Sequence, residues 1–465
     1  MEQIIFDKQH LMQLSEKLKA VWKEMPETEP DFLEQYSSAG QEKKEREISR
    51  AVEKGKNGLG EYPQSFFAFR KRKKWKRQME ELSESFLQEE PLLDIGSVMG
   101  KGELRDFQAS MKAFLRNARK FDKKLGLEDM GQALRNYMVY AIFLALNGRE
   151  LKYRPAAFGY SMLYPYTDNY IDSPERTGAE KEHYNRLIED RLKGKSVKAL
   201  SCHEKKTAEL LAQIEKDYGR PHEVYEGLLL MLEAQENSLH QEEGWKREKK
   251  ESLWQENGQG GEEDLHWEEK RKREDKLQQT WERVLGVSIY KGGISVMVDR
   301  YFVDKPWTER DLYFYYGFGF LLQLCDDLQD IVQDKEEGNP TVFSLCRTKG
   351  EAVRKVNKLL HFTKALFGFC DTEKPEFKGF LQKNCYLLIL ASAAGNAEWM
   401  EEEWLARMER RLPVRLKYLQ EFGIGMLGAR RKEQEEGEKN KGEDREKERK
   451  KFMRMLDVLI AEERN

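Results

Sequence analysis

The chain carries, from residue 319 to residue 334, the sequence Gly319-Phe320-Leu321-Leu322-Gln323-Leu324-Cys325-Asp326-Asp327-Leu328-Gln329-Asp330-Ile331-Val332-Gln333-Asp334. Its long apolar run before the acids, uninterrupted by proline until Pro340, predicts a helix. Asp326, Asp330 and Asp334 recur every fourth residue and therefore share one helical face. Like charges at this spacing destabilise a helix by roughly 0.2–0.5 kcal/mol per pair, so packing alone does not favour them. Clustered carboxylate oxygens are ligands that suit Mg²⁺.

This acidic segment resembles the second aspartate-rich motif of trans-isoprenyl diphosphate synthases, G-x-x-x-Q-x-x-D-D-x-x-D. The matching positions are Gly319, Gln323, Asp326, Asp327 and Asp330, whereas Leu322 stands where Phe is usual. Downstream, Gly338-Asn339-Pro340 resembles the family's G-K-P element with Asn in place of Lys. The segment also resembles the looser acidic motif of class I terpene synthases, with Asp330 in place of Ser or Thr. A solvated acidic helix end is the alternative, and the apolar run before the acids argues against it.

A second acidic cluster lies at the end of the aromatic stretch 158–172. Asp168 and Asp172 are four residues apart and resemble the outer acids of the first aspartate-rich motif of class I isoprenoid enzymes, D-D-x-x-D. Asn169 replaces the second Asp, and its amide oxygen can ligate a metal without adding charge. Terpene synthases tolerate this variation better than chain-elongating synthases do. The alternative interpretation is an Asp/Asn-rich helix end.

Three shorter elements resemble diphosphate-contacting segments of the same superfamily. Arg154-Pro155 matches the end of a G-K-R-x-R-P element, and Gln235 begins a Gln-x-x-Ser-Leu run similar to G-Q-x-x-D-L. Lys291 resembles the Lys of a K-T element, with Gly292 in place of Thr. Two consecutive glycines weaken a helix, so we expect the backbone there to approach a ligand or to kink. A lone Lys is, alternatively, an ordinary surface residue.

The resemblance implies a complete set of site residues. It implies three Mg²⁺ ions held by Asp168, Asn169, Asp172, Asp326, Asp327, Asp330 and Asp334. The catalytic acids are expected to be Asp168, Asp172, Asp326 and Asp330. Substrate contacts are expected from Arg154, Gln235, Lys291, Gln323, Tyr164 and Phe320. Aromatic side chains beside each cluster can line an apolar pocket that shields a carbocation.

The composition fits a large helical protein with charged additions. The chain has 465 residues, of which 35% are charged, and its formal net charge is −3. This balance gives no argument for nucleic acid as a partner. The five cysteines form no CxxC pair and are expected to be reduced thiols. The N-terminus shows no secretory pattern, and no apolar run is long enough to span a bilayer. We therefore expect a cytoplasmic protein.

We predict an all-α fold, an isoprenoid-synthase-type helical bundle with additions. Residues 1–125 are predicted to be a charged helical extension and 126–425 the isoprenoid-synthase-like domain, with a charged insertion at 241–276. Residues 426–465 form a charged tail ending in a short amphipathic helix. The basic and aromatic run 66–77 suggests peripheral contact with an anionic membrane, although a solvated helix start is the simpler interpretation. A late Arg–Tyr diphosphate contact is expected at Arg415 and Tyr418.

Three functions remain open from the sequence. The favoured one is a class I terpene synthase, a lyase that ionises an allylic isoprenoid diphosphate with Mg²⁺ and then cyclises or eliminates. The alternative is a trans-prenyl chain-elongating transferase, which the degraded element at Arg154-Pro155 and the missing second Asp of the first motif disfavour. The third is a non-catalytic helical isoprenoid-binding protein. All three have an isoprenoid ligand as partner, and a homodimer is a further hypothesis. The shared prediction is that the two acidic clusters meet across one apolar hollow.

Overall fold

The computed structural model describes residues 8–58, 69–89, 92–171, 173, 175–238, 245, 267–419, 456–457 and 459–460. Within these ranges every regular element is a helix and no strand is present, which confirms the all-α prediction. The helices are α1 (Lys8–Glu24), α2 (Ser38–Gly58), α3 (Phe69–Glu89), η1 (Ile95–Ser97), α4 (Lys101–Phe121), α5 (Leu127–Leu146), α6 (Pro155–Ile171), α7 (Gly178–Leu192), α8 (Cys202–Asp217), α10 (Trp267–Tyr301), α11 (Glu309–Gln329), α12 (Ile331–Glu337), α13 (Lys349–Phe367), α14 (Pro375–Gly395), η3 (Ala397–Trp399), α15 (Glu402–Glu409) and α16 (Leu416–Tyr418). A further helical segment spans 224–238.

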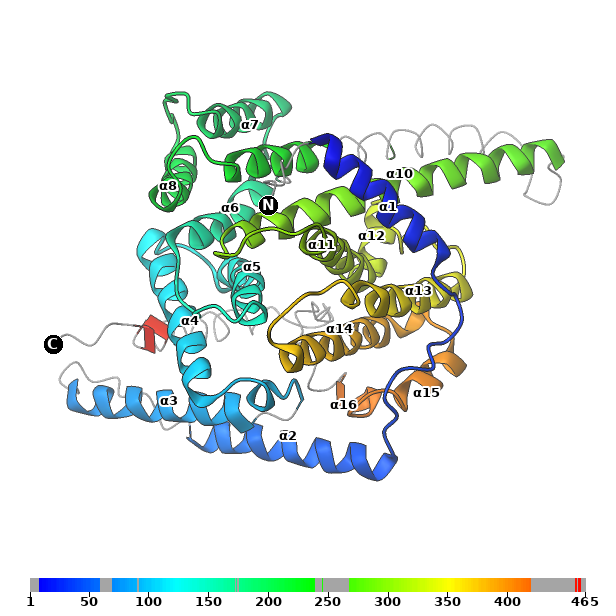
Figure 1. Ribbon diagram of the computed structural model, residues 1–465, viewed down its shortest axis with the longest axis horizontal. Helices are drawn as coiled ribbons and strands as arrows, with labels where there is room; N and C mark the ends of the chain where they lie inside the picture. Colours follow the sequence, from blue (N-terminus) through cyan, green and yellow to red (C-terminus); the bar gives the residue numbers. More distant parts are fainter. Residues whose placement is uncertain are drawn as a thin grey trace, which may run out of the picture.

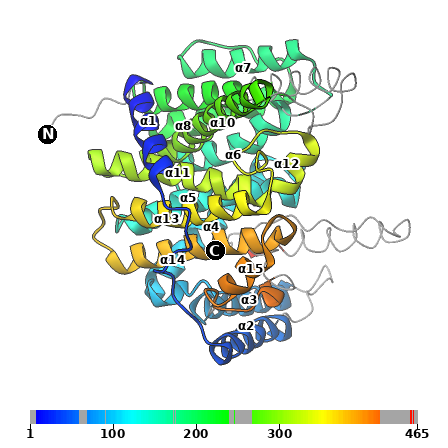
Figure 2. The same ribbon diagram turned by 90° about the vertical axis from the view of Figure 1, so that its right-hand side faces the viewer.

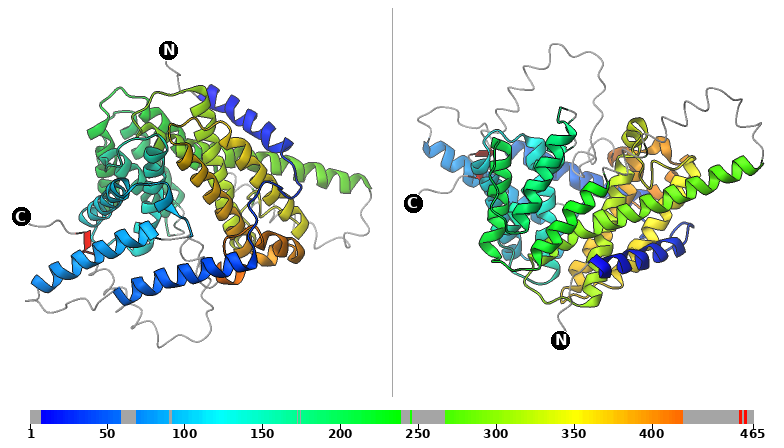
Figure 3. Two further views of the ribbon diagram at one scale, coloured as in Figure 1. Left: turned by 60° about the horizontal axis from the view of Figure 1, so that its bottom comes forward. Right: turned by 90° about the horizontal axis from the view of Figure 1, so that it is seen from above.

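The helices are arranged around α5 and α11, which lie near the middle of the molecule (Figure 1). α5 packs against α4, α6, α10 and α14, and its Phe143 ring meets Tyr315 and Phe318 of α11 at centroid distances of 4.7 and 5.8 Å. α7 lies at one edge, while α2 and α3 lie at the opposite edge (Figures 1 and 2). The N-terminal part of α10 projects from the body (Figure 3). The described part of the chain contains no helix both long and apolar enough to cross a membrane.

α1 belongs to the same core as the helices of the 126–425 region. Its repeat of Leu11, Leu14, Leu18 and Trp22 follows helical spacing, and all four side chains are buried. α1 packs on α10 and α13, and the Trp22 ring meets Phe320 of α11 edge-on at 5.7 Å. The N-terminal segment therefore contributes directly to the packing around the acidic helix.

α10 and α11 cross at a pair of glycines. A Cβ atom placed on Gly319 would lie 2.0 Å from the carbonyl oxygen of Gly292, and one on Gly292 would lie 2.5 Å from the carbonyl oxygen of Gly319. Only glycine permits two helix backbones to approach so closely. The consecutive glycines of α10 thus accommodate a neighbouring helix, rather than the ligand or kink that we expected.

The acidic helix bends within its motif. We expected one helix through Asp334, but α11 ends at Gln329 and α12 begins at Ile331, with Asp330 at φ −100° and ψ 13° between them. The amide of Asp330 still donates to the carbonyl of Asp326, and that of Asp334 to the carbonyl of Asp330. The i, i+4 register therefore continues through the bend.

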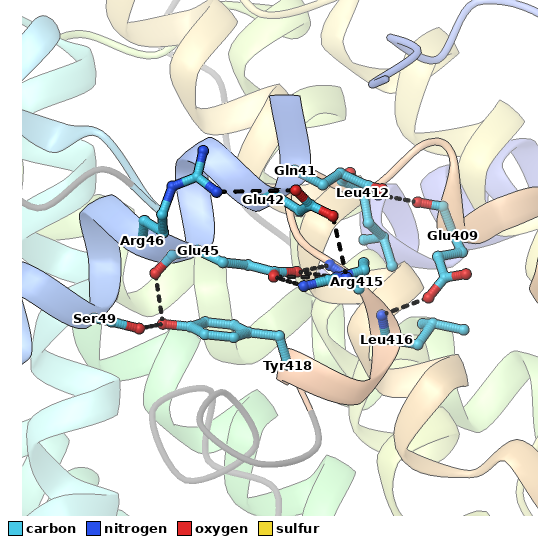
Figure 4. Close-up of polar contacts among 10 residues, drawn as sticks. All are labelled: Gln41, Glu42, Glu45, Arg46, Ser49, Glu409, Leu412, Arg415, Leu416 and Tyr418. Atoms are coloured by element: carbon cyan, nitrogen blue, oxygen red, sulfur yellow. Dashed lines mark hydrogen bonds and ion pairs between the residues drawn. The ribbon is translucent and has the colours of Figure 1, made fainter. Parts of the chain in front are cut away.

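The segment around α16 is held by α2 (Figure 4). The Arg415 guanidinium donates to both carboxylate oxygens of Glu45 at 2.5–3.1 Å, and it lies 3.6 Å from Glu42. The Tyr418 hydroxyl donates to the Glu45 carbonyl at 3.2 Å. Both side chains expected to contact diphosphate are instead bound to the N-terminal extension, which sequence spacing alone did not indicate.

Arg415→Ala is predicted to destabilise the fold by about 1–3 kcal/mol, because the nearly buried Glu45 carboxylate loses its cation. Its hydrogen bonds with Arg415 keep the pKa of Glu45 below its usual value against the effect of burial, so that pKa should rise in the variant. Chemical denaturation measures the free energy of unfolding. The exposed neighbour Arg410 supplies the control, since Arg410→Ala should cost less than about 0.5 kcal/mol. Equal losses of stability in the two variants would contradict the role of Arg415 in holding the α16 segment against α2.

Candidate functional site

The second motif divides into one buried and three more accessible carboxyl groups. Asp327 is 4% exposed; its carboxylate accepts from the Gln323 side chain at 2.9 Å and from the Val342 amide at 3.5 Å. Asp326 is exposed, whereas Asp330 and Asp334 are partly buried. The face that carries Asp326, Asp330 and Asp334 is therefore the accessible one. Asp327, the fourth ligand predicted from this motif, is buried and instead joins α11 to the segment after α12.

The carboxyl groups of this motif act on one another. Burial, followed by the negative charges of Asp326 and Asp334, raises the pKa of Asp327 to about 7, although its hydrogen bond from Gln323 opposes the shift. Burial also raises the pKa of Asp334 to about 7, and the charges of Asp330 and Asp326 add to the effect. Crowded carboxylates of this kind are stabilised by a bound cation.

Lys291 and Gln323 come from different helices and lie at the same level of the bundle. A Cβ atom on Gly292, the residue after Lys291, would lie 2.8 Å from the Cβ of Gln323. The glycine crossing therefore fixes the position of the predicted diphosphate-binding Lys along α10 relative to the acidic helix α11. Lys291 is partly buried.

The first motif lies at the C-terminal end of α6. The Asp168 carboxylate accepts a hydrogen bond of 2.7 Å from the Gln235 side chain, on the helical segment 224–238. Gln235 is buried, and its Oε1 atom has no hydrogen-bond partner among the described residues. Asn169 is exposed and donates to Asp129 of α5 at 3.3 Å. The side chains of Asp168 and Gln235, both predicted site residues, are therefore in contact. Asp172 lies outside the described residues.

The remaining predicted substrate contacts lie in different surroundings. Arg154 donates to the Tyr218 hydroxyl and the Phe302 carbonyl at 3.1 Å and also binds Asp304, so its guanidinium joins α6 to the end of α10. Phe320 is fully buried, and its ring packs on Trp22 and on Phe362, 5.3 Å away. Tyr164 is partly buried on α6.

The described hollows do not coincide with the acids. A hollow of about 940 Å³ lies between α7 and the segment 224–238, and one of about 410 Å³ lies between the 33–44 arm and α14. Neither is lined by an aspartate of either motif. Among the described side chains, no three His, Cys, Asp or Glu converge closely enough to hold a metal ion by themselves.

The donor set fits magnesium that arrives with a phosphate ligand. Mg²⁺ usually keeps several waters and binds proteins through one or two carboxylates together with substrate phosphates, rather than in an all-protein cage. The accessible Asp326 and the partly buried Asp330 supply hard oxygen ligands of this kind. Asp334, with its raised pKa, would release its proton when a cation binds.

Asp299 is a buried acid that sequence reasoning missed. It is 4% exposed on α10, its Oδ1 atom has no hydrogen-bond partner in the described part of the chain, and burial raises its pKa well above the usual range. Its charge would act on Tyr160 of α6, whose hydroxyl donates to the Ser295 carbonyl one turn earlier on α10. Its position two turns after Lys291 was the available signal, because an acid inside an apolar helical run is rarely without function or partner.

Comparisons of this chain with protein-family models, with curated proteins and with solved structures gave no match. The family resemblance therefore depends on the motif residues alone.

In metal-free protein, the contribution of Asp327 to stability should fall as the pH rises from about 4 to about 7. In this window folded Asp327 keeps the proton that the unfolded chain, with the ordinary pKa of 3.8, has released. At this position the folded state then binds more protons, so the Asp327 contribution to the free energy of unfolding falls with pH and levels above about 7. Asp327→Asn should remove this pH-dependent contribution. Its free energy of unfolding should exceed that of the parent by on the order of 1–4 kcal/mol at pH 8 and by little at pH 4. Urea unfolding with a chelator present measures both proteins, and a pH-independent difference would contradict the prediction.

Proposed function

We propose that this chain is a class I terpene synthase-like enzyme that ionises an allylic isoprenoid diphosphate with the help of Mg²⁺. One observation carries the proposal: the glycine crossing sets Gly292, the residue after Lys291, against Gln323, one turn before the crowded carboxylates of α11. This chemistry needs a cationic side chain, a hydrogen-bond donor to the diphosphate oxygens and acidic metal ligands, all on adjacent helices.

In this mechanism the carboxylates of Asp326 and Asp330 would hold Mg²⁺ and so orient the diphosphate. Lys291 donates charge-assisted hydrogen bonds to the diphosphate oxygens, and these bonds strengthen as the leaving group gains charge. Asp168 lies on α6, and the hydrogen bond from Gln235 orients its carboxylate. Magnesium, when bound, supplies Lewis-acid neutralisation of the departing diphosphate. The apolar and aromatic side chains of α6, α10 and α11 limit access of water to the carbocation that remains when the diphosphate leaves.

The proposal is tested with geranyl, farnesyl and geranylgeranyl diphosphates as substrates. Mg²⁺-dependent release of diphosphate, abolished by chelator, is expected with at least one of them, together with hydrocarbon or alcohol products. Absence of release from protein shown to be folded by circular dichroism and cooperative unfolding would reject the enzyme proposals.

Chain elongation is the second candidate, and the surroundings of Arg154 count against it. Elongation needs a second, metal-free diphosphate site built from basic side chains, but Arg154 is already bound to Tyr218, Phe302 and Asp304. Addition of isopentenyl diphosphate separates the two, because a transferase would yield longer diphosphates. A non-catalytic isoprenoid-binding protein would bind the substrates without releasing diphosphate.

A further inference from the structure

The N-terminal half of α3 is a strongly basic surface. Residues 70–77 comprise seven Lys or Arg side chains, Trp75 and no acid. Five of the cations are exposed and are called here the α3 basic face: Arg70, Lys71, Lys73, Lys74 and Arg77.

Helix stability does not account for this arrangement. The N-terminus of a helix carries partial positive charge, so acids are favoured there and cations are unfavourable. The first turn of α3 contains no acid. The pairs Arg70–Lys74 and Lys73–Arg77 add repulsion between like charges one turn apart. An external anion would relieve both unfavourable terms.

The four acids of α3 lie in its second half; neighbouring helices bind three of them, and the fourth, Glu81, lies 3.5 Å from Arg77 of the α3 basic face. Glu80 lies 3.0 Å from Lys112 and Glu84 lies 2.6 Å from Arg105, both on α4. Glu89 lies 2.8 Å from Lys54 of α2. These contacts fix the acidic half against the body, so positive charge dominates the opposite half.

The apolar side of α3 is turned into the protein. Trp75 and Met79 are 3% and 6% exposed, so they anchor the helix and leave the charged side outside. α3 lies at the edge of the molecule, and its basic half extends past α4 (Figures 1 and 3). The membrane interpretation of the 66–77 run relied on basic and aromatic residues acting together, but the Trp75 side chain is buried, and Phe66 and Phe67 lie outside the described residues.

We propose that the α3 basic face binds the headgroups of anionic lipids at a bilayer surface, by charge and without insertion. Anionic leaflets attract clustered Lys and Arg residues within about a Debye length, roughly 8–10 Å at physiological salt. Single-stranded nucleic acid is a poorer fit, because its proteins offer aromatic side chains for base stacking and the aromatic ring described here is buried. This inference does not depend on the proposed enzymatic function.

The test is flotation of the full chain with vesicles of phosphatidylcholine alone or with about 30% phosphatidylserine. We expect binding to the anionic vesicles only, and its loss when the salt concentration approaches about 1 M, where the Debye length is about 3 Å. The triple variant Arg70→Gln, Lys71→Gln, Lys74→Gln should reduce partitioning by at least about tenfold. Thermal unfolding should show it to be at least as stable as the parent, because like-charge repulsion is removed.

A matched variant at the opposite edge removes the same charge. Arg186, Lys193 and Lys198 are exposed on and after α7, and their replacement by Gln should change partitioning by less than about twofold. Equal losses in the two variants, or equal binding to neutral vesicles, would overturn the proposal. Tighter binding to an RNA oligomer that the α3 variant abolishes would also overturn it, by assigning the face to nucleic acid.

Discussion

Asp326→Asn should lower magnesium-dependent diphosphate release by about 100-fold or more while leaving the fold as stable as before. The side chain is exposed, so the substitution removes little packing. It removes a negative charge that raises the pKa of both Asp327 and Asp334. Stability at pH 8 should therefore be unchanged or higher, and both pKa values should fall, which carboxyl ¹³C NMR titration can measure.

The exposed Glu336 of α12 provides the matched control. Glu336→Gln removes one negative charge close to the motif but not within it, and turnover should stay within about twofold of the parent. A large loss of stability in Asp326→Asn would instead assign that residue a structural role. Unchanged turnover would remove the second motif from the mechanism.

Gly319→Ala should destabilise the protein by about 3 kcal/mol or more, or prevent folding. The added methyl group would lie 2.0 Å from the Gly292 carbonyl oxygen and 2.9 Å from the Cα of Gly293. These are backbone atoms of α10, so relief requires the two helices to separate. Because the crossing sets the position of Lys291 along α10 relative to α11, any folded fraction should also bind a diphosphate less tightly.

Gly379 offers the opposite case on α14. A Cβ atom there meets nothing within 4 Å, so Gly379→Ala should stabilise the protein by about 0.5–1 kcal/mol through helix propensity. Denaturant unfolding compares the two variants directly. A cost below about 1 kcal/mol for Gly319→Ala would show that the helices do not need to approach so closely.

The parts of the site that follow from local spacing could be predicted from sequence. The run from Gly319 predicts the acidic helix because its apolar residues and acids are contiguous, and α11 confirms it through Gln329. Spacing could not show which acid is buried, since Asp327 contacts Val342, and the position of that residue depends on the turn after α12. The contact of Gly292, the residue after Lys291, with Gln323 follows from the glycines only once their partner helix is known.

Long-range packing accounts for most of what sequence reasoning missed. Phe320 was expected to contact substrate, but Trp22 of α1 packs on it across some 300 residues of chain, and Ser15 of α1 hydrogen-bonds its neighbour Tyr316 one turn earlier on α11. Arg415 was assigned by its position in a family pattern, whereas Glu45 of α2 binds it in the structure. Neither partner lies in the region that resembles the family, so no motif could indicate them.

The position of α1 has a practical consequence for how fragments of this protein are designed. A shortened chain that starts near residue 126 would lack Trp22 and the leucines beside it. The apolar surface of Phe320 and Phe362 that they cover would then be exposed to solvent. Such a fragment should precipitate or recruit chaperones. Recombinant versions meant for assays or crystals need to begin upstream of Lys8, even though the acidic motifs all lie far beyond it.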